Sequence, residues 1–268
     1  MKKLLTRADD FGASPGTNTA ILEAARAGLV RNVGVMAPGP WLEHHLENLL
    51  AMRELICVGL HATLNSEWAG LRWGPMAGAA SVPGLVRADG TFHEKVEHTH
   101  RFADPEEGVG EIRAQLEHLR SLGLEPEYLD CHMVFNWHPD WDRALGELAI
   151  AEGLVYHAHG MLPALHLRIS KAFRPGPEDV LQFMKRENVD RAAWVFHPAR
   201  RDAVSDQFRT DPDMPATRVA ETRHLEYRFL TDSRSVQSFL DCREIELIRY
   251  DQLSNMPVLQ PRQVLQQK

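Results

Sequence analysis

The 268-residue sequence lacks several features that mark whole classes of protein. No apolar run approaches the roughly 18 residues of a membrane-spanning helix. The apolar N-terminal stretch is interrupted by Arg7, Asp9 and Asp10 before the core of a signal peptide could form. No cluster of lysine and arginine is long enough to follow a phosphate backbone, and the formal charge of -7 is spread along the chain. We therefore expect neither a membrane segment nor a nucleic-acid partner.

Cysteine is also scarce. Cys57, Cys131 and Cys242 stand far apart and form no C-x-x-C pair, which argues against a disulfide framework and against a structural zinc knuckle. This pattern fits a reducing, cytoplasmic location. The apolar share of 44% and the charged share of 25% are ordinary for a globular protein. We expect one domain over residues 1–268, because single α/β barrels commonly reach this length.

Short β-rich runs alternate with longer amphipathic segments, which is the pattern of βα units around a parallel sheet. Ser14 and Pro15 predict the start of a first helix that ends at Gly28, and a later helix runs from near Asp104 to Gly123. The predicted fold class is α/β. The seven candidate strands are residues 3–8, 33–37, 56–61, 128–132, 154–158, 193–197 and 245–250.

Two regions break this alternation, at about residues 65–101 and 200–215. The first is rich in glycine, proline, tryptophan and histidine, and the second is rich in charge. Both follow predicted strands. Long insertions after the strands of a parallel barrel lie on the face that holds the substrate. We expect the two insertions to form pocket walls or a lid.

Acidic and histidine side chains stand at the ends of four predicted strands. Because the carboxyl ends of barrel strands meet at one rim, we expect these side chains to converge on one site. They are Asp9 and Asp10 after the first strand, His61 at the end of the third, Asp130 and His132 at the end of the fourth, and His197 at the end of the sixth.

One carboxylate and two imidazoles form a partly filled shell for a divalent cation, as in catalytic metal sites. Asp10, His61 and His132 are the predicted ligands of one divalent metal ion, with Zn or Mg favoured and Co or Mn also accommodated. Asp9 stays unligated and is the candidate base that takes a proton from metal-bound water. His197, on a different strand, is the candidate general acid for a leaving amine.

Other residues are candidates for supporting the ligands or contacting the substrate. Asp130 precedes His132 by two residues, so both side chains can face the barrel mouth. We expect Asp130 to orient an imidazole, with a hydrogen bond to the backbone as the alternative. Tryptophan faces stack on sugar rings but more often fill cores. We expect at least one of Trp68, Trp73 and Trp137 to line the pocket.

These residues match a known family. The chain resembles the YdjC-like carbohydrate deacetylases, a branch of the wider polysaccharide deacetylase group. Residues 7–12 (RADDFG) look like that family's A-D-D-F-G opening, and residues 59–64 (GLHATL) are similar to its G-L-H-L-x-L segment. Residues 129–132 (LDCH) resemble its D-S-H, residues 196–198 (FHP) its C-H-P, and residues 223–230 its R-x-x-E-x-x-x-L helix.

The resemblance implies a distorted parallel barrel of seven βα units, a divalent metal ion and hydrolysis of acetamido groups on N-acetylated sugars or small oligosaccharides. It gives Asp9 the role of base and His197 that of acid. It also makes Asp10, His61 and His132 the metal ligands. A homodimer is compatible with this assignment.

The sequence also departs from the family pattern. Val134 and Asn136 stand where the family's D-S-H-x-H-x-H continues with histidine, and Ala199 replaces the glycine after H-P. His157 and His159 occupy the region of an arginine that is common in the family after the fifth strand. We therefore count Asn136, His157 and His159, together with Trp137, as candidates for substrate contact or ligand support.

Two alternatives remain open on the sequence alone. The chain could be a metal hydrolase of the same fold that acts on a non-sugar amide or ester, or a sugar-binding protein whose catalytic site has decayed. The presence of Asp9 argues against decay, because a protein that only binds metal needs no free base beside the ligands.

Overall fold

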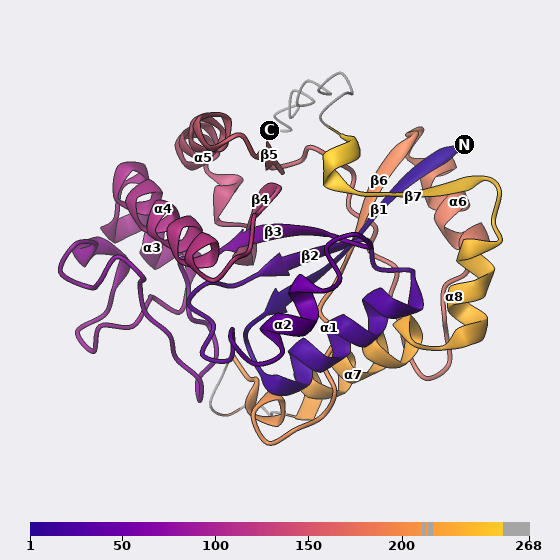
Figure 1. Ribbon diagram of the computed structural model, residues 1–268, viewed down its shortest axis with the longest axis horizontal. Coiled ribbons are helices and arrows are strands. Elements are labelled where there is room, and N and C mark those ends of the chain that lie inside the picture. Colours follow the sequence, from indigo (N-terminus) through magenta and orange to yellow (C-terminus); the bar gives the residue numbers. More distant parts are fainter. Residues whose placement is uncertain (211–212, 214–216, 254–268) are drawn as a thin grey trace.

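The computed structural model describes residues 1–210, 213 and 217–253 (Figure 1). Its centre is a seven-stranded parallel sheet with the order β5-β4-β3-β2-β1-β6, in which β7 pairs with the first half of β1. The predicted α/β class and its seven strands are confirmed. The strands are β1 (Lys2–Phe11), β2 (Asn32–Val35), β3 (Cys57–Ala62), β4 (Tyr128–Cys131), β5 (Val155–Tyr156), β6 (Arg191–Phe196) and β7 (Ile245–Ile248).

The sheet curls into a half-barrel instead of closing through regular strand pairs. β5 and β6 are the two ends of the strand order. In the part of the chain that the structure describes, the segment after β5 meets β6 in an isolated parallel bridge, in which Ala164 pairs with Ala193 and the Leu165 N–H donates to the Ala193 carbonyl at 2.7 Å. The distorted barrel that the sequence predicted is therefore a curled parallel sheet with an irregular seam.

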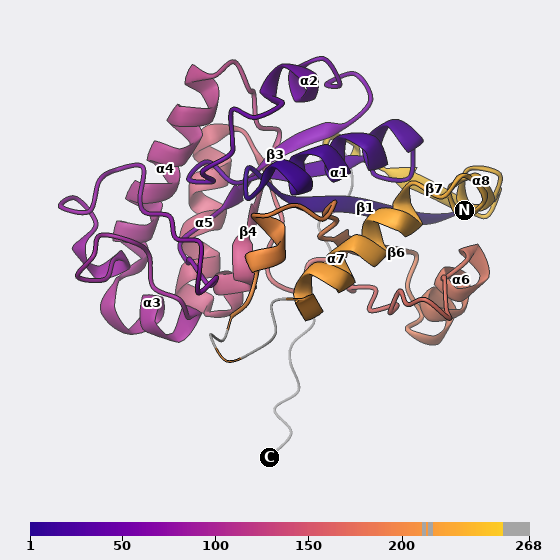
Figure 2. The ribbon, with the colours of Figure 1, turned by 90° about the horizontal axis from the view of Figure 1, so that it is seen from below.

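Helices flank the sheet, and α7 lies beside α1 (Figures 1 and 2). The helices are α1 (Pro15–Ala27), α2 (Leu46–Leu50), α3 (Val96–Phe102), α4 (Pro105–Ser121), α5 (Pro139–Glu152), α6 (Pro177–Arg186), α7 (Thr217–Leu230) and α8 (Ser233–Leu240). Short 3₁₀ turns are η1 (Pro83–Leu85), η2 (His132–Trp137), η3 (Ser205–Gln207) and η4 (Tyr250–Gln252). No helix in residues 1–210 and 217–253 has the length and apolar character of a membrane span.

Local capping chemistry explains the two helices that the sequence predicted. The Ser14 hydroxyl accepts a hydrogen bond from the Thr17 N–H at the start of α1, and Gly28 ends this helix with a φ of +106°. The Asp104 carboxylate accepts from the Glu107 N–H at the start of α4. The predicted starts are confirmed, and α4 ends at Ser121, two residues before the predicted Gly123.

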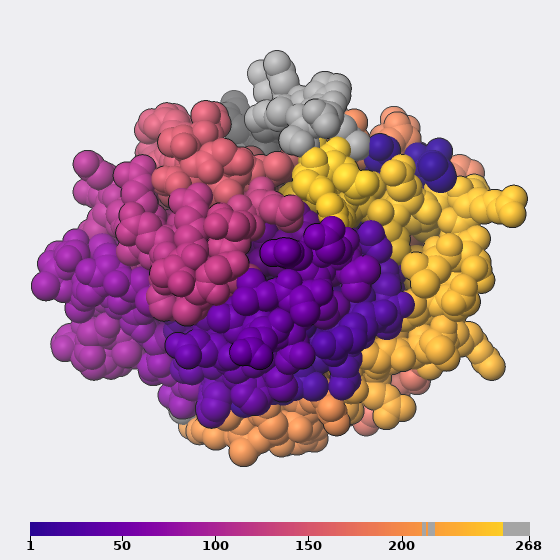
Figure 3. Space-filling model, in the orientation of Figure 1, coloured from indigo at the N-terminus to yellow at the C-terminus, as the bar shows by residue number. Residues whose placement is uncertain are grey.

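The insertion at residues 65–101 is anchored to α4. The buried Glu111 carboxylate accepts hydrogen bonds from the Met76 and Ala77 N–H groups, both at 2.9 Å. Glu107 accepts another from Gly84 at 2.6 Å. In the space-filling view this insertion, in purple, forms the left end of the molecule (Figure 3). In the second insertion, residues 211, 212, 214 and 215 lie outside the described residues.

Candidate metal centre

A β-bulge places two consecutive aspartates at the same site. Successive side chains of a strand point to opposite faces, so a regular strand would separate Asp9 from Asp10. Between the pairs Ala8–Val33 and Phe11–Val35, β1 contains one residue more than β2. Asp10 also has a left-handed φ of +72°. A bulge of this kind redirects a side chain, and both aspartates are buried with only 1% of their surface exposed.

The three predicted ligands lie together at the carboxyl ends of β1, β3 and β4. His61 Nε2 is 3.5 Å from Asp10 Oδ1, and His132 Nδ1 is 3.3 Å from the same oxygen. The two ring nitrogens are 3.2 Å apart. These three of the six residues predicted to converge therefore meet at one place, and we call them the ligand triangle.

The donor atoms of the ligand triangle fit a divalent cation. Ligands about 2.0–2.1 Å from a tetrahedral Zn²⁺ stand about 3.3–3.4 Å apart. Neighbouring ligands of an octahedral Mg²⁺ at about 2.0–2.1 Å stand about 2.9 Å apart. The observed separations of 3.2, 3.3 and 3.5 Å match the first case better. Asp10 Oδ1 is buried and faces the two ring nitrogens at 3.3 and 3.5 Å, so it is placed to give an electron pair to a cation held between them.

A carboxylate supports the outer nitrogen of His61. Asp130 Oδ2 lies 2.7 Å from His61 Nδ1, so Asp130 contacts the imidazole as expected and leaves Nε2 facing the ligand triangle. Burial opposes a charge on this ring, but the negative charges of Asp130 and Asp9 raise the pKa of His61 well above its usual value. Asp130 therefore fixes both the orientation and the electrostatic environment of His61.

Glu67 supports His132 in the same way, and the sequence analysis missed it. Its Oε2 lies 2.9 Å from His132 Nε2, which leaves Nδ1 for the ligand triangle. Burial opposes the charged ring, yet the charge of Glu67 and the hydrogen bond to Asp10 raise the pKa of His132 to about 9. Glu67 belongs to the insertion that was expected to wall the pocket, but it stands at no strand end.

Arg7 fixes Asp9. Its Nε and Nη2 donate to the two oxygens of the Asp9 carboxylate at 2.7 and 2.8 Å. Arg7 also forms an ion pair with Asp130 at 2.9 Å and donates to the Tyr250 hydroxyl at 2.7 Å. Asp9 Oδ2 also lies 4.0 Å from His61 Nδ1, so Asp9 stands beside one residue of the ligand triangle and is bound to a buried guanidinium. The sequence could have predicted this contact, because Arg7 and Asp9 are two residues apart on one strand and so point to the same face of the sheet.

Arg223 of α7 contacts Asp10, the carboxylate of the ligand triangle. Its Nη2 donates to Asp10 Oδ2 at 2.7 Å, and its guanidinium lies 5.2 Å from the Trp68 ring and 5.1 Å from the Phe208 ring. Burial opposes ionisation of Asp10, but the positive charge of Arg223 and hydrogen bonds from His132 hold the pKa of Asp10 well below its usual value. Both insertions thus contribute a ring to the environment of a predicted ligand.

A cavity of about 410 Å³ opens beside Arg223. His197, at the end of β6, lines this cavity, and its backbone N–H donates to Glu226 Oε2 at 2.6 Å. No direct contact joins His197 to the ligand triangle among the described residues. The lining residues are His197, Arg218, Val219, Thr222, Arg223 and Glu226. We call this space the α7 cavity.

Asn136 and His159 meet at a residue of α5. The Asn136 side-chain amide donates to Asp142 Oδ1 at 3.1 Å and to the Tyr156 hydroxyl at 3.0 Å. The His159 N–H donates to the same Asp142 oxygen at 2.9 Å. These contacts bind the segment after β4 to the segment after β5.

His157 and Trp137 take different positions. His157 Nδ1 lies 2.6 Å from the hydroxyl of Tyr250, so His157 is linked through Tyr250 to Arg7. Trp137 is 49% exposed, and its ring centroid lies 4.9 Å from that of His100. Trp73, another candidate for lining the pocket, is buried, and its ring centroid lies 6.2 Å from that of His132.

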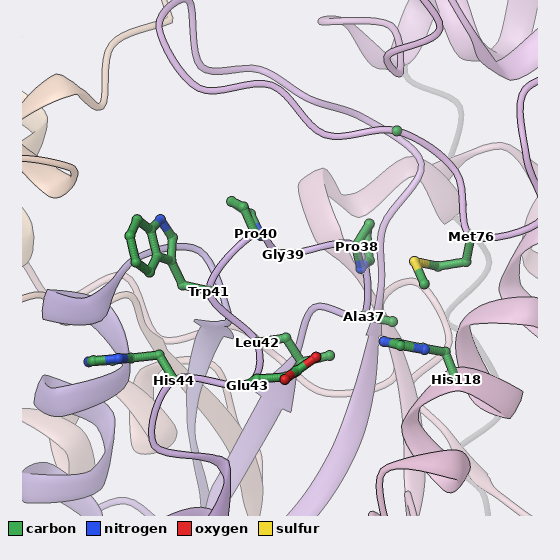
Figure 4. Close-up of a pocket in the computed structure, with 11 residues that line it drawn as sticks. Ala37, Pro38, Gly39, Pro40, Trp41, Leu42, Glu43, His44, Met76 and His118 are labelled. Atoms are coloured by element: carbon green, nitrogen blue, oxygen red, sulfur yellow. The ribbon is translucent and has the colours of Figure 1, made fainter.

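A second cavity, of about 540 Å³, shares no residue with the ligand triangle or the α7 cavity. The segment 37–44 lines one side of it, and Met76 and His118 lie on the other (Figure 4). Its lining includes Glu43, His44 and His118. The predicted ligands Asp10, His61 and His132 lie outside this cavity.

Comparison with known proteins identifies the family of this chain. A family model described as YdjC-like protein matches residues 3–241. A carbohydrate deacetylase of Thermoanaerobacter pseudethanolicus is 30% identical over 263 residues, which cover 93% of this chain and 98% of that protein. A carbohydrate deacetylase of Vibrio vulnificus strain YJ016 is 26% identical over 96% of this chain and 98% of its own length.

Two further comparisons cover different shares of the chain. A carbohydrate deacetylase of Brevibacillus brevis is 34% identical over 137 residues, which is 51% of each protein. Among solved structures, one from Enterococcus faecalis V583, named as a cellobiose-phosphate cleavage protein, matches with a TM-score of 0.78. It is 22% identical, and the match covers 94% of this chain and 98% of that one. This structural similarity confirms the fold.

Proposed function

Because this chain belongs to the YdjC-like protein family, we propose that it is a metal-dependent hydrolase that removes acetyl groups from N-acetylated sugars or oligosaccharides. The observation that carries this proposal is the buried ligand triangle with an unligated carboxylate, Asp9, next to it. The curated relatives named above as carbohydrate deacetylases support the reaction class.

Asp10, His61 and His132 would hold the metal ion. A bound cation supplies two effects, since it lowers the pKa of a coordinated water and polarises the acetyl carbonyl. The separations within the ligand triangle favour Zn²⁺ over Mg²⁺. Asp130 and Glu67 keep the two imidazoles oriented toward the ion.

Asp9 is the proposed base. Arg7 bonds to both of its oxygens, but each carboxylate oxygen offers two lone-pair positions, so Asp9 can still accept a proton. The bidentate contact also prevents the carboxylate from rotating onto the cation. Arg7 therefore keeps Asp9 oriented and available for proton transfer.

His197 is the proposed general acid. It lines the α7 cavity, and Arg223, which lines the same cavity, donates to the ligand Asp10. An N-acetyl group held in this cavity would present its nitrogen to His197 from the side of β6. The leaving amine needs a proton as the C–N bond breaks.

A second candidate function is hydrolysis of a non-sugar amide or ester. The segment directly after His132 presents Met133 and Val134 with 38% and 52% of their surface exposed. Val134 stands where the family pattern continues with histidine, so this rim offers apolar contact in place of polar side chains. Such a rim favours a substrate with an apolar portion.

An acetate-release assay separates the two functions. Protein loaded with Zn²⁺ is incubated with N-acetylglucosamine, its β1,4-linked dimer and trimer, and N-acetylated alkylamines that carry no sugar. The proposal predicts acetate from at least one of the sugars. Turnover of the alkylamides alone would favour the second function and overturn the first.

A further inference from the structure

Among the described residues that line the α7 cavity, Glu226 of α7 is the acidic one. It lies three residues after Arg223, which binds the ligand Asp10, and its Oε2 accepts the backbone N–H of His197 at 2.6 Å. Glu226 therefore joins the end of β6 to the helix that holds a predicted ligand. The sequence analysis gave it no role beyond a place in the R-x-x-E pattern.

The bonding of Glu226 is incomplete among the described residues. Its carboxyl group accepts the His197 N–H and forms no ion pair with a lysine or arginine of the described chain. Glu226 is half-buried, and a charge that is partly withdrawn from water and unpaired is costly. The environment of Glu226 thus suits a neutral carboxylic acid, which can donate a proton into the cavity.

The electrostatic environment supports the same state. Burial raises the pKa of Glu226 above its usual value, and the negative charge of Asp10 adds to this rise. The pKa of Glu226 is lowered in part by the charges of His197 and Arg223 and by the His197 N–H, but these effects do not reverse the rise. The groups that face Glu226 are therefore Asp10 from β1, His197 from β6, and Arg218 and Arg223 from α7.

We propose that Glu226 is a second acid of this site, donating its carboxyl proton to the leaving nitrogen of the substrate in the α7 cavity. This inference rests on the proposed deacetylase function. Outside β1, the residues grouped with Asp9 are His61 of β3 and Asp130 of β4, on one side of β1 in the order of the sheet, whereas His197 and Glu226 lie on the side of β6. Base and acid thus flank the ligand Asp10 from opposite sides.

The proton balance is complete without any further reactant. Water loses a proton to Asp9, and its oxygen forms a bond to the acetyl carbon. The C–N bond then breaks, and the nitrogen keeps the bonding electron pair and takes the proton of Glu226. The hydroxyl proton of the new acetic acid is released, Asp9 returns its proton to solvent and Glu226 regains one, which leaves one proton over. His197, the first acid, passes that proton to the amine, so the products are acetate and the ammonium form of the amine.

Glu226→Gln tests this role, because glutamine still offers an oxygen to the His197 N–H but cannot deliver a proton. Wild type and variant, both loaded with Zn²⁺, are compared on the N-acetylglucosamine dimer and on p-nitrophenyl acetate, whose leaving group departs as a stable anion. Glu221→Gln is the matched control, since Glu221 lies on the same helix, is exposed and pairs with Lys171. Metal content and thermal unfolding are measured for all three proteins.

We expect E226Q to lose about 10²-fold or more in kcat on the amide and to stay within about threefold of wild type on the ester. A residue that only anchored the backbone of His197 would instead lower both rates together, and that result, or an unchanged amide rate, would overturn the inference. A second measurement needs no ester turnover. The wild-type rate on the amide should fall at alkaline pH, and the pH dependence of this rate should differ in E226Q. An identical pH profile in both proteins would also overturn it.

The wild-type protein separates this inference from the function on which it rests. If wild type releases acetate from the dimer and E226Q matches it, only the role of Glu226 is wrong. If wild type releases no acetate from any N-acetylated sugar, the proposed function and the inference are both overturned.

Discussion

Glu67 Oε2 lies 2.9 Å from His132 Nε2, so a residue of the long insertion after β3 supports a predicted ligand at the end of β4. His61 has a matching contact with Asp130 at 2.7 Å. Each imidazole of the ligand triangle therefore has a carboxylate behind it, which fixes the ring and increases its basicity toward a metal ion. The insertion thus contributes a carboxylate to the surroundings of the ligand triangle.

Glu67→Gln should weaken metal binding by about 10-fold to 100-fold without unfolding the protein, because a carboxylate behind a ligating imidazole strengthens it. The Zn²⁺ affinity of the metal-free protein, measured by calorimetry or with a competing chelator, checks this. Glu97→Gln is the matched control, since Glu97 lies exposed on the same insertion. Equal affinities in E67Q and E97Q would contradict a role for Glu67.

Asp9→Asn should keep the metal ion, and its kcat should fall by about 10²-fold to 10⁴-fold, because Asn cannot take the proton from water. Metal content and acetate release are measured on the same preparation. Asp10→Asn provides the contrast, since the loss of a ligand charge should remove the metal and the activity together. Full activity in D9N would exclude Asp9 as the base.

His197→Ala should lower the rate on the N-acetylated dimer by about 10²-fold if the imidazole donates a proton. The substitution preserves the contact to Glu226, because that hydrogen bond comes from the backbone N–H of residue 197. The comparison therefore isolates the ring. An amide rate equal to that of wild type would remove His197 from the mechanism.

His157 predicts acid sensitivity of the fold. Burial and the nearby charge of Arg7 lower the pKa of His157 to about 3, whereas an unfolded histidine titrates near about 6.5. The unfolded state then binds a proton that the folded state does not. The contribution of His157 to stability is therefore complete above about pH 6.5 and falls as the pH drops toward 3, by at most about 2 kcal/mol between pH 6.5 and pH 5. The raised pKa values of His61 and His132 act in the opposite direction over this window, equally in wild type and in a His157 variant.

His157→Gln tests this dependence, because glutamine can still contact Tyr250 but does not titrate. The free energy of unfolding by urea is measured at pH 7 and pH 5 for the metal-free proteins. The variant should lose less stability between the two values than wild type. The lowered pKa values of Asp10 and Asp130 act below this window in both proteins. Equal losses would show that another group controls the acid response.

Strand ends were the part of the site that the sequence could predict. Parallel strands bring their carboxyl ends to one rim, so Asp10, His61 and His132 could be placed together from the order of the runs alone. The start of α1 followed equally well from Ser14 and Pro15, because capping is local chemistry. Both arguments depend on short stretches of sequence.

Residues that reach the site from insertions or helices could not be placed in this way. Glu67 depends on how a long insertion packs on α4, and Arg223 depends on how α7 lies across the ends of β1 and β6. The bulge at Asp10 was also hidden, since strand periodicity alone would send Asp9 and Asp10 to opposite faces. These features depend on contacts between segments far apart in the chain.

The most direct test of the account is a titration of acetate release against added Zn²⁺. Protein stripped with a chelator is supplied with increasing amounts of the ion, and acetate from the N-acetylglucosamine dimer is measured at each point. The ligand triangle predicts no acetate without metal and full release near one ion per chain. Equal release from the stripped and the loaded protein would contradict a metal-dependent mechanism.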